Sequence, residues 1–350
     1  MTPFLLPLLM CPVTRAPLKL VDAEMAPDGT ITSGMLVSTK DPKRRYPVVR
    51  GVPRFVPPPE VENHAAVEAF GDQWNFFNYD RFKEHFLEFG MNPTFGGIAW
   101  MKDKLVLDTG SGSGMQIKWM VEAGAKHVIG LELSQSVDGV MADNLREVKN
   151  VDIIQCSIDQ IPLRDEAIGA ELAPAGGLVM CHNAIQHTPN VQRTLTELWR
   201  VTGAGSELAF NCYTRNDSTH ITRWRHRIYS TLRVFISSLP FSFRLGYAHL
   251  MSALRFVPFL GWFLEKADWM RRGDVPTSIA GRERWRQLYR VGVLHTFNYF
   301  GSHQYQHHHS FPELQSMVEK LEPKPEMLNA EKFFTPHHAT GMMLRLLRRG

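Results

Sequence analysis

The 350-residue sequence predicts an α/β protein: a doubly wound, mainly parallel sheet with a small β-rich N-terminal module and a helical cap insertion. Three observations support this fold class. From residue 104, short apolar runs alternate with segments of helical spacing, as in parallel sheets covered by helices. A glycine-rich loop follows the first of these runs, and a later region rich in Trp and Arg has helical spacing. The expected parts are 1–57 (β-rich module), 58–103 (helical segment), 104–217 (core of the sheet), 218–292 (helical cap or lid) and 293–350 (C-terminal part of the sheet).

The N-terminal module is expected to consist of short strands joined by turns. Apolar runs at Leu18–Val21, Met35–Val37 and Pro47–Val49 are separated by turn signals such as Pro27-Asp-Gly29. Prolines at 57–59 predict a stiff linker. The following stretch, 61–100, is rich in aromatic residues and is expected to be helical.

The core is expected to contain five parallel strands. They are predicted at Leu105–Leu107, His127–Leu131, Val151–Ile154, Leu178–Cys181 and Glu207–Asn211. Helices are expected over Met115–Glu122 and around Leu195 and Leu198, and Ser134 is suited to cap a helix after the second strand. Beyond the cap, a helix over Phe311–Leu321 and a strand around Lys332–Phe334 complete the pattern.

Composition places few limits on function. The formal net charge of +4 is mild, whereas nucleic-acid binding calls for a concentrated basic face. Four cysteines without C-x-x-C spacing predict neither a redox motif nor a metal site, and they fit a reducing, cytoplasmic location. The apolar N-terminus lacks a basic region and contains prolines, so we interpret it as a buried segment. No uninterrupted apolar run reaches the ~18 residues needed to span a bilayer.

The loop Asp108-Thr-Gly110-Ser-Gly112-Ser-Gly114 is the segment that the sequence predicts to bind a ligand. Its glycines let the backbone approach a ligand, and the next helix offers unpaired N–H groups. A dinucleotide fold would need G-x-G-x-x-G, but Met115 stands where the third glycine belongs. The spacing therefore favours a ligand with an amino-acid tail, whose ammonium group meets the field of Asp108. Glu132, at the end of the second strand, is suited to accept both hydroxyls of an adenosine ribose.

The ends of the third and fourth strands complete this constellation. They read Cys156-Ser-Ile-Asp159 and Cys181-His-Asn-Ala-Ile-Gln-His-Thr-Pro189, and parallel strands present such ends at one crevice. Residues 104–213 resemble the class I S-adenosylmethionine-dependent methyltransferases, especially the branch that acts on small molecules. The resemblance implies a Rossmann-like methyltransferase sheet and S-adenosylmethionine as cofactor.

The resemblance also implies roles for individual residues. The methionine moiety would lie on Gly110 and Gly112, Glu132 would hold the ribose, and Leu133 would pack on the adenine. Ser157 and Ile158 would face the adenine edge; Ser157 departs from the family's usual aspartate and accepts a hydrogen bond more weakly. Asn183 is expected to line the cofactor or the substrate.

Two flanking segments extend the likeness. Residues 9–53 resemble the small zinc-ribbon-like proteins that activate RNA and protein methyltransferases, but Cys11, Thr14, Ser38 and Asp41 stand where those have four cysteines. One thiolate does not make a structural zinc site, so we predict a module without zinc. The segment Phe70–Asn75 resembles one that covers the cofactor in related enzymes.

Several residues have two interpretations. His187 is a candidate general base or a histidine that only bonds its own loop. Tyr213 is a candidate for orienting substrate or a core aromatic residue. The run His307–His309, with His303, fits a substrate-pocket rim or a surface loop better than a metal site. The cap, with Arg223, Arg225, Arg227 and Arg233, fits a packed lid or a peripheral membrane contact.

The expected function is methyl transfer from S-adenosylmethionine to a small-molecule acceptor such as a glycan, a lipid or a secondary-metabolite precursor. The first alternative is an RNA methyltransferase that holds RNA with its N-terminal module. The second is a catalytically silent cofactor-binding or scaffold protein. The sequence indicates no metal and sets no oligomeric state.

Overall fold

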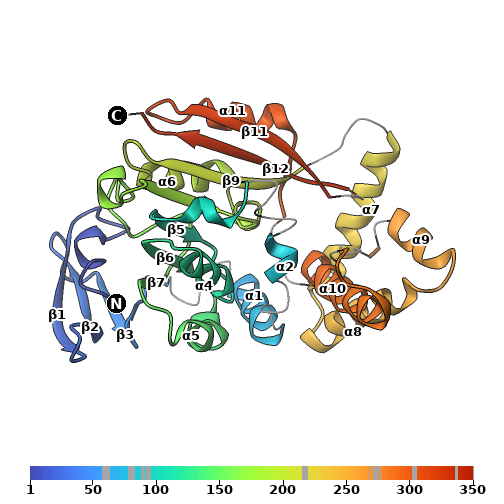
Figure 1. The fold of residues 1–350 in the computed structure, drawn as a ribbon, viewed down its shortest axis with the longest axis horizontal. Coiled ribbons are helices and arrows are strands. Elements are labelled where there is room, and N and C mark those ends of the chain that lie inside the picture. Colours follow the sequence, from blue (N-terminus) through green and yellow to red (C-terminus); the bar gives the residue numbers. More distant parts are fainter. Residues whose placement is uncertain are drawn as a thin grey trace.

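The computed structural model describes residues 1–56, 64–77, 83–87, 91, 96–214, 220–267, 269–270, 275, 277–301, 306–335 and 338–349. The predicted proline linker at 57–59 lies outside these residues. Three parts are visible in Figure 1: the N-terminal module at one end, the central sheet with its helices, and a group of cap helices at the opposite end. The α/β fold class predicted from the sequence is confirmed.

The central sheet has seven strands in the order β11-β12-β9-β8-β5-β6-β7, and a short strand, β10, pairs with β9. Strands β5 to β9 are parallel, β12 is antiparallel to β9, and β11 is antiparallel to β12. The order reverses at β5, whose neighbours are β6 and β8, so the loops after β5 and β8 diverge and leave a crevice at the carboxyl ends. The bounds are β5 (Leu105–Thr109), β6 (His127–Glu132), β7 (Val151–Gln155), β8 (Gly177–Cys181), β9 (Glu207–Thr214), β10 (His308–His309), β11 (Glu326–Thr335) and β12 (His338–Leu347).

Both faces of the sheet are covered because its strands are buried throughout. Along β5, Leu105 and Leu107 belong to one core cluster and Val106 to another, as the alternation of side chains in a strand requires. The first cluster includes α6 (Val191–Val201), α11 (Phe311–Val318) and the N-terminal module. The second includes α4 (Met115–Glu122), with α5 (Val140–Leu145) beside it.

The N-terminal module is a four-stranded antiparallel sheet docked on the edge of the central sheet (Figure 1). Its last strand bridges to β7, where the Phe55 amide donates to the Gln155 carbonyl over 2.7 Å. Thr2 donates twice to the buried carboxylate of Asp152, from its amide and its hydroxyl. Its elements are η1 (Leu6–Leu8), β1 (Leu18–Met25), β2 (Ile31–Ser38), β3 (Arg45–Val49) and β4 (Val52–Pro53).

The cap is helical, and it packs against the segment that precedes the core. The Gln73 side chain donates to Asn298 over 3.1 Å, joining α1 (His64–Phe76) to α10. Helix α10 runs through residue 292, so cap and C-terminal part share one continuous helix. In the described part of the chain, no helix is both long and apolar enough to cross a membrane. The cap helices are α7 (His220–Ser237), α8 (Phe241–Leu254), α9 (Leu260–Lys266) and α10 (Gly281–Gly301).

The remaining short elements connect these parts. They are α2 (Lys83–Phe86), η4 (Ile98–Met101), η5 (Gln135–Asp138), η6 (Ala170–Leu172) and η7 (Ile185–His187). Ser134 caps η5 as expected, because its side chain accepts a hydrogen bond from the Ser136 amide.

Candidate active site

The glycine-rich loop turns sharply between β5 and α4. Gly110 and Gly112 have φ values of +88° and +56°, in the left-handed region that favours glycine. The Gly110 and Ser111 amides both donate to the Leu131 carbonyl, over 2.8 and 3.0 Å, which ties the loop to the end of β6. Gly114 is the N-terminal cap of α4. The loop backbone is thus fixed before any ligand arrives.

Glu132 organises the loop from the end of β6. Its Oε2 accepts from the Gly112 amide over 2.7 Å and its Oε1 from the Ser134 amide over 2.8 Å. Burial raises the pKa of Glu132, and the amide hydrogen bonds from Ser134 and Gly112 oppose this shift. Each carboxylate oxygen retains a further lone pair, so Glu132 can still accept hydrogen bonds from the cavity.

Asp108 lies beneath the loop, at 1% exposure. Its Oδ2 atom has no hydrogen-bond partner among the described residues. Burial raises the pKa of Asp108 to about 7; a hydrogen bond with Ser111 opposes the shift, and the nearby charge of Glu132 adds to it. A buried carboxylate with one oxygen unpartnered among the described residues is a ready acceptor for a cationic ligand group.

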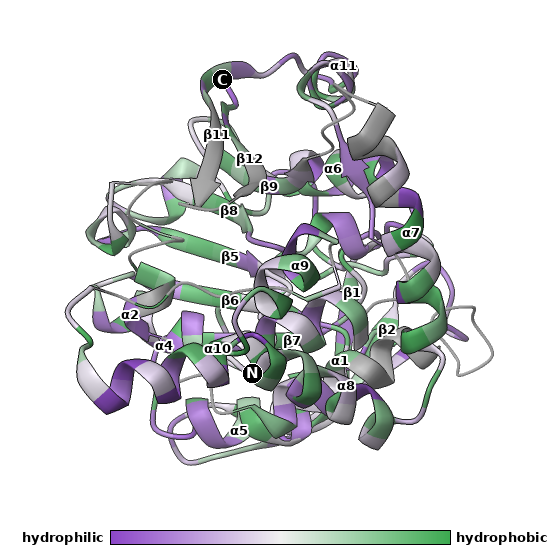
Figure 2. Cartoon of the chain, turned by 90° about the vertical axis from the view of Figure 1, so that its right-hand side faces the viewer, coloured by the Kyte–Doolittle hydropathy of each residue, from purple (hydrophilic) through white to green (hydrophobic). Residues whose placement is uncertain are grey.

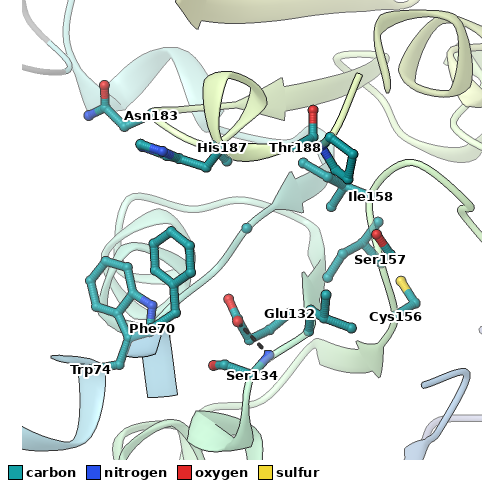
Figure 3. A pocket seen from close by; sticks show the side chains of 15 residues that line it. Phe70, Trp74, Glu132, Ser134, Cys156, Ser157, Ile158, Asn183, His187 and Thr188 are labelled. Carbon is teal, nitrogen blue, oxygen red and sulfur yellow. Dashed lines mark hydrogen bonds between the residues drawn. The ribbon is translucent and has the colours of Figure 1, made fainter. Parts of the chain in front are cut away.

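The structure brings most of the predicted site residues to one cavity of about 760 Å³, measured with its open mouth (Figure 3). Asp108, Gly112 and Gly114 are not among the residues that line it. Glu132 and Ser134 lie at the opposite end of the cavity from Asn183 and His187. The lining consists of Phe70, Trp74, Gly110, Leu131, Glu132, Leu133, Ser134, Cys156, Ser157, Ile158, Asn183, Ala184, His187, Thr188 and Pro189.

Six of these lining residues had no individual ligand-binding role predicted from the sequence: Leu131, Ser134, Cys156, Ala184, Thr188 and Pro189. All six belong to the ends of β6, β7 and β8 or to the segments that follow them. The rule that ligands bind at the carboxyl ends of parallel strands indicates these segments, and it does not say which of their residues face the cavity.

Helix α1 covers the cavity. A Cβ placed on Gly112 would lie 2.8 Å from the Trp74 indole, so this ring rests directly on the glycine loop. Asn75 holds the helix down, since its Oδ1 accepts from the Val140 amide over 3.0 Å. Phe70 and Trp74 therefore form one wall of the cavity, as Figure 3 shows.

The side of the cavity after β7 is formed by Cys156, Ser157 and Ile158. The Ser157 hydroxyl donates to Asp159 Oδ1 over 2.6 Å, which the sequence did not reveal. Because its proton is used in this bond, the Ser157 oxygen offers only lone pairs to a ligand. Burial raises the pKa of Cys156, so this thiol stays neutral.

Aromatic and amide side chains surround the end of the cavity that lies opposite Glu132. The His187 ring meets Phe70 and Tyr213 edge-on, at 5.6 and 5.5 Å between ring centroids. Asn183 and Asn211 form two hydrogen bonds with each other. The Asn183 backbone N–H donates to Asn211 Oδ1, and Asn211 Nδ2 donates to Asn183 Oδ1 over 2.6 Å. This end has polar groups suited to orient a second molecule.

The segment His307–His309 lies beside the end of the cavity that contains Asn183 and His187. The His307 amide donates to the Gln186 carbonyl, and His308 pairs with Tyr213 between β10 and β9. The rings of His307 and His309 stack at 6.2 Å, whereas His308 meets Tyr213, so the three histidines do not share one direction. His303 lies outside the described residues.

Two segments of the chain match models of known protein families. Residues 107–210 match a family model described as a methyltransferase domain, and residues 2–51 match one described as Trm112p-like protein. The chain carries a methyltransferase domain. The cofactor of this domain is S-adenosylmethionine, and the chain is an S-adenosylmethionine-dependent methyltransferase.

Solved structures similar to this methyltransferase share little sequence with it. The complex of the Haloferax volcanii Trm112 methyltransferase activator with a putative methyltransferase is 10% identical, with a TM-score of 0.44, covering 81% of this chain and 99% of that one. An Aquifex aeolicus S-adenosylmethionine-dependent methyltransferase is 10% identical, with a TM-score of 0.41, covering 78% and 99%. The [4+2]-cyclase SpnF is 20% identical, with a TM-score of 0.30; the match spans 35% of this chain and 44% of that one.

The Trm112p-like module of this methyltransferase has a hydrogen-bonded cluster at the predicted degenerate zinc positions. Cys11 Sγ lies 3.1 Å from the Tyr46 hydroxyl and accepts from the Thr14 amide over 3.3 Å. The Thr14 and Ser38 hydroxyls are 2.9 Å apart, and the Asp41 amide donates to Ser38. These groups hydrogen-bond to one another at the positions that the sequence resemblance assigns to the zinc ligands.

Proposed function

We propose that this chain transfers the methyl group of S-adenosylmethionine to a small, uncharged acceptor such as a glycan, a lipid or a secondary-metabolite precursor. One observation carries the proposal: among the described residues, none of the 15 that line the cavity is Lys or Arg. Phosphate-rich substrates are held by such cations. A cavity lined by apolar and neutral polar side chains and the Glu132 carboxyl group suits a molecule without phosphate groups instead.

The cofactor fits the residues present. The ammonium group of its methionine end would be held by Asp108, whose buried Oδ2 atom has no partner among the described residues. The ribose hydroxyls would donate to Glu132, and the adenine would lie between Leu133 and Ile158 with its amino group near Ser157. The carboxylate of the methionine end would lie over the loop from Gly110 to Gly114, whose glycines let a ligand approach the backbone.

The cofactor supplies a methyl group already activated on a sulfonium. The chain's own residues bind and orient the two reactants and keep water out. Phe70 and Trp74 exclude water by covering the cavity. His187 is positioned to take a proton when the acceptor is a hydroxyl, because it lies at the end of the cavity opposite Glu132.

The experiment uses radiolabelled S-adenosylmethionine with two acceptor fractions: cell-extracted small molecules and lipids, and purified RNA. We expect label in the first fraction and none in RNA. Label in RNA that disappears on nuclease treatment would overturn the choice of acceptor. Absence of label in both, together with no binding of S-adenosylhomocysteine, would favour the silent scaffold.

Two variants separate binding from transfer in that assay. Both carboxylate oxygens of Glu132 accept hydrogen bonds from backbone amides, so Glu132→Gln would place its NH₂ group against one of these N–H donors. This variant should lose both cofactor binding and transfer. His187→Gln should keep cofactor binding and slow transfer to a hydroxyl acceptor. Glu122→Gln is the matched control, because Glu122 is the last residue of α4, away from the loop, and its described ion pair is with the partly exposed Lys83.

A further inference from the structure

The cap exposes an apolar loop between α8 and α9. Five consecutive residues, Phe256-Val-Pro-Phe-Leu260, are all exposed, and Phe259 is 88% exposed. Phe259 also has φ +63°, a left-handed conformation that is costly for a bulky residue. Runs of exposed apolar residues are rare in proteins unless they serve an interaction.

Helix α9 continues this surface outward. Phe259, Trp262, Phe263 and Lys266 follow helical spacing on one face, and Trp262 and Phe263 are 60% and 52% exposed. The opposite face carries Leu264, which packs with Met251 and Met270 in a small core. One apolar face of α9 therefore packs against the rest of the cap, while a second apolar face is exposed to solvent.

Helix α9 packs closely against the end of α8. A Cβ on Gly261 would lie 2.2 Å from the Arg255 carbonyl oxygen, so the start of α9 packs directly on the end of α8. In Figure 1, α9 lies at the outer edge of the cap helices, and in Figure 2 it faces the viewer. The exposed aromatic side chains thus project from a rigid base.

The surface extends to the start of α10. Phe256 and Trp285 have ring centroids 5.2 Å apart, and Trp285 is 61% exposed. Arg282 and Arg286 flank Trp285 on the same helix and are exposed. We name Phe256, Phe259, Trp262, Phe263 and Trp285, with Lys266, Arg282 and Arg286, the aromatic–basic surface.

Charge concentrates in this part of the chain. Residues 220–301 contain 13 Lys and Arg and 4 Asp and Glu, a formal charge of +9, whereas the whole chain carries +4 and its remainder therefore −5. Of these cations Arg233 and Arg244 are buried, and Arg286 lies 3.8 Å from Glu283, so the exposed excess is smaller but remains positive. The partner should consequently be anionic. It should also accept aromatic side chains, because the exposed rings form the outer part of the surface.

We propose that the aromatic–basic surface docks on a membrane whose protein-facing leaflet contains anionic phospholipids. Aromatic rings belong at the headgroup level of a bilayer, and Lys and Arg beside them bind headgroup phosphates. Phe259 and Trp262 enter the interface, while Lys266, Arg282 and Arg286 remain among the headgroups. The proposal goes beyond methyl transfer and does not depend on the identity of the acceptor.

The test is sedimentation of the full chain with vesicles of pure phosphatidylcholine and of equal parts phosphatidylcholine and phosphatidylglycerol. We expect binding to the mixed vesicles, at least about tenfold weaker binding to the neutral ones, and weakening by salt. Phe259→Asp should reduce binding at least about tenfold. Met25→Asp is the matched control, because Met25 is 57% exposed in the N-terminal module and should not affect binding.

A second readout remains informative if Phe259→Asp disturbs the cap. Wild-type tryptophan fluorescence should shift to shorter wavelength on mixed vesicles, and Trp262→Phe should reduce this shift while retaining binding. No binding to mixed vesicles, or equal binding by Phe259→Asp, would overturn the proposal. So would a dimer in light scattering that Phe259→Asp dissociates, or RNA binding that outcompetes the vesicles.

Discussion

The carboxyl group of Asp108 is buried and its Oδ2 atom has no partner among the described residues, so it is costly to ionise in the free protein. Its pKa of about 7 lies above the ordinary value of 3.8. The folded protein therefore binds more protons than the unfolded chain between these values, and stability falls as pH rises through this window. At about 1.36 kcal/mol per unit, roughly 2 kcal/mol is lost between about pH 5 and pH 7.

An Asp108→Asn variant keeps the shape of the side chain and removes this ionisation. Relative to wild type, its free energy of unfolding should rise by roughly 2 kcal/mol between about pH 5 and pH 7, measured by urea denaturation. Asp152→Asn is the matched control. Asp152 is equally buried but accepts two hydrogen bonds from Thr2 and lies 3.0 Å from His127, so this variant should be destabilised by about 1–3 kcal/mol.

The same Asp108→Asn variant should bind S-adenosylhomocysteine about 10- to 100-fold more weakly at pH 8, as the loss of a charged hydrogen bond implies. Gain in stability together with loss of affinity is the signature of a residue kept for binding. An Asp108→Asn protein that is less stable than wild type at pH 7, or that binds the ligand unchanged, would refute this reasoning.

Four further predictions follow from the site and the module. Gly112→Ala should lower the free energy of unfolding by about 1–2 kcal/mol, because left-handed backbone and the Trp74 indole both oppose a Cβ; an unchanged urea midpoint would contradict this. Ser157→Ala should weaken S-adenosylhomocysteine binding about 2- to 10-fold in calorimetry, and complete loss would mean that Ser157 supports the fold instead. His187→Gln should leave that affinity unchanged and slow transfer to a hydroxyl acceptor about 10²- to 10⁴-fold; lost affinity would assign His187 to the cofactor. Chelation with EDTA should not move Tm, since Cys11 is hydrogen-bonded within the module; a fall in Tm that zinc reverses would disprove it.

Apolar runs made the strands of the core predictable. Leu178–Cys181 is a continuous apolar run of strand length, Val151–Ile154 is apolar except for Asp152, and the structure places β8 and β7 there within one residue. β9 runs three residues beyond the predicted Asn211, to Thr214. Its neighbours β10 and β12 come from the far end of the chain, and such pairing leaves little trace in local sequence.

The C-terminal hairpin was only half predicted. The sequence indicated a strand around Lys332–Phe334, which belongs to β11, but β12 at His338–Leu347 was not predicted. β12 lies between β9 and β11, and its alternation of Leu344, Arg345 and Leu346 is short. Sheet neighbours rather than local spacing define this strand.

The sequence was sufficient to predict which positions form the candidate site, but not the hydrogen bonds and contacts between their side chains. The glycine loop and Glu132 are recognisable because backbone geometry and strand ends constrain residue type. The bonds from Ser157 to Asp159 and between Asn183 and Asn211 depend on side-chain directions that only the fold defines. The contact of Trp74 with Gly112 joins segments about forty residues apart, which no local pattern encodes.

The measurement that tests the central claim most directly is calorimetric titration of the purified chain with S-adenosylhomocysteine, alongside Glu132→Ala and the surface control Glu122→Ala. The account predicts one site of about micromolar affinity in wild type and in Glu122→Ala, and no detectable binding in Glu132→Ala. Undiminished binding by Glu132→Ala, or no binding by well-folded wild-type protein, would contradict the assignment of this cavity to the cofactor.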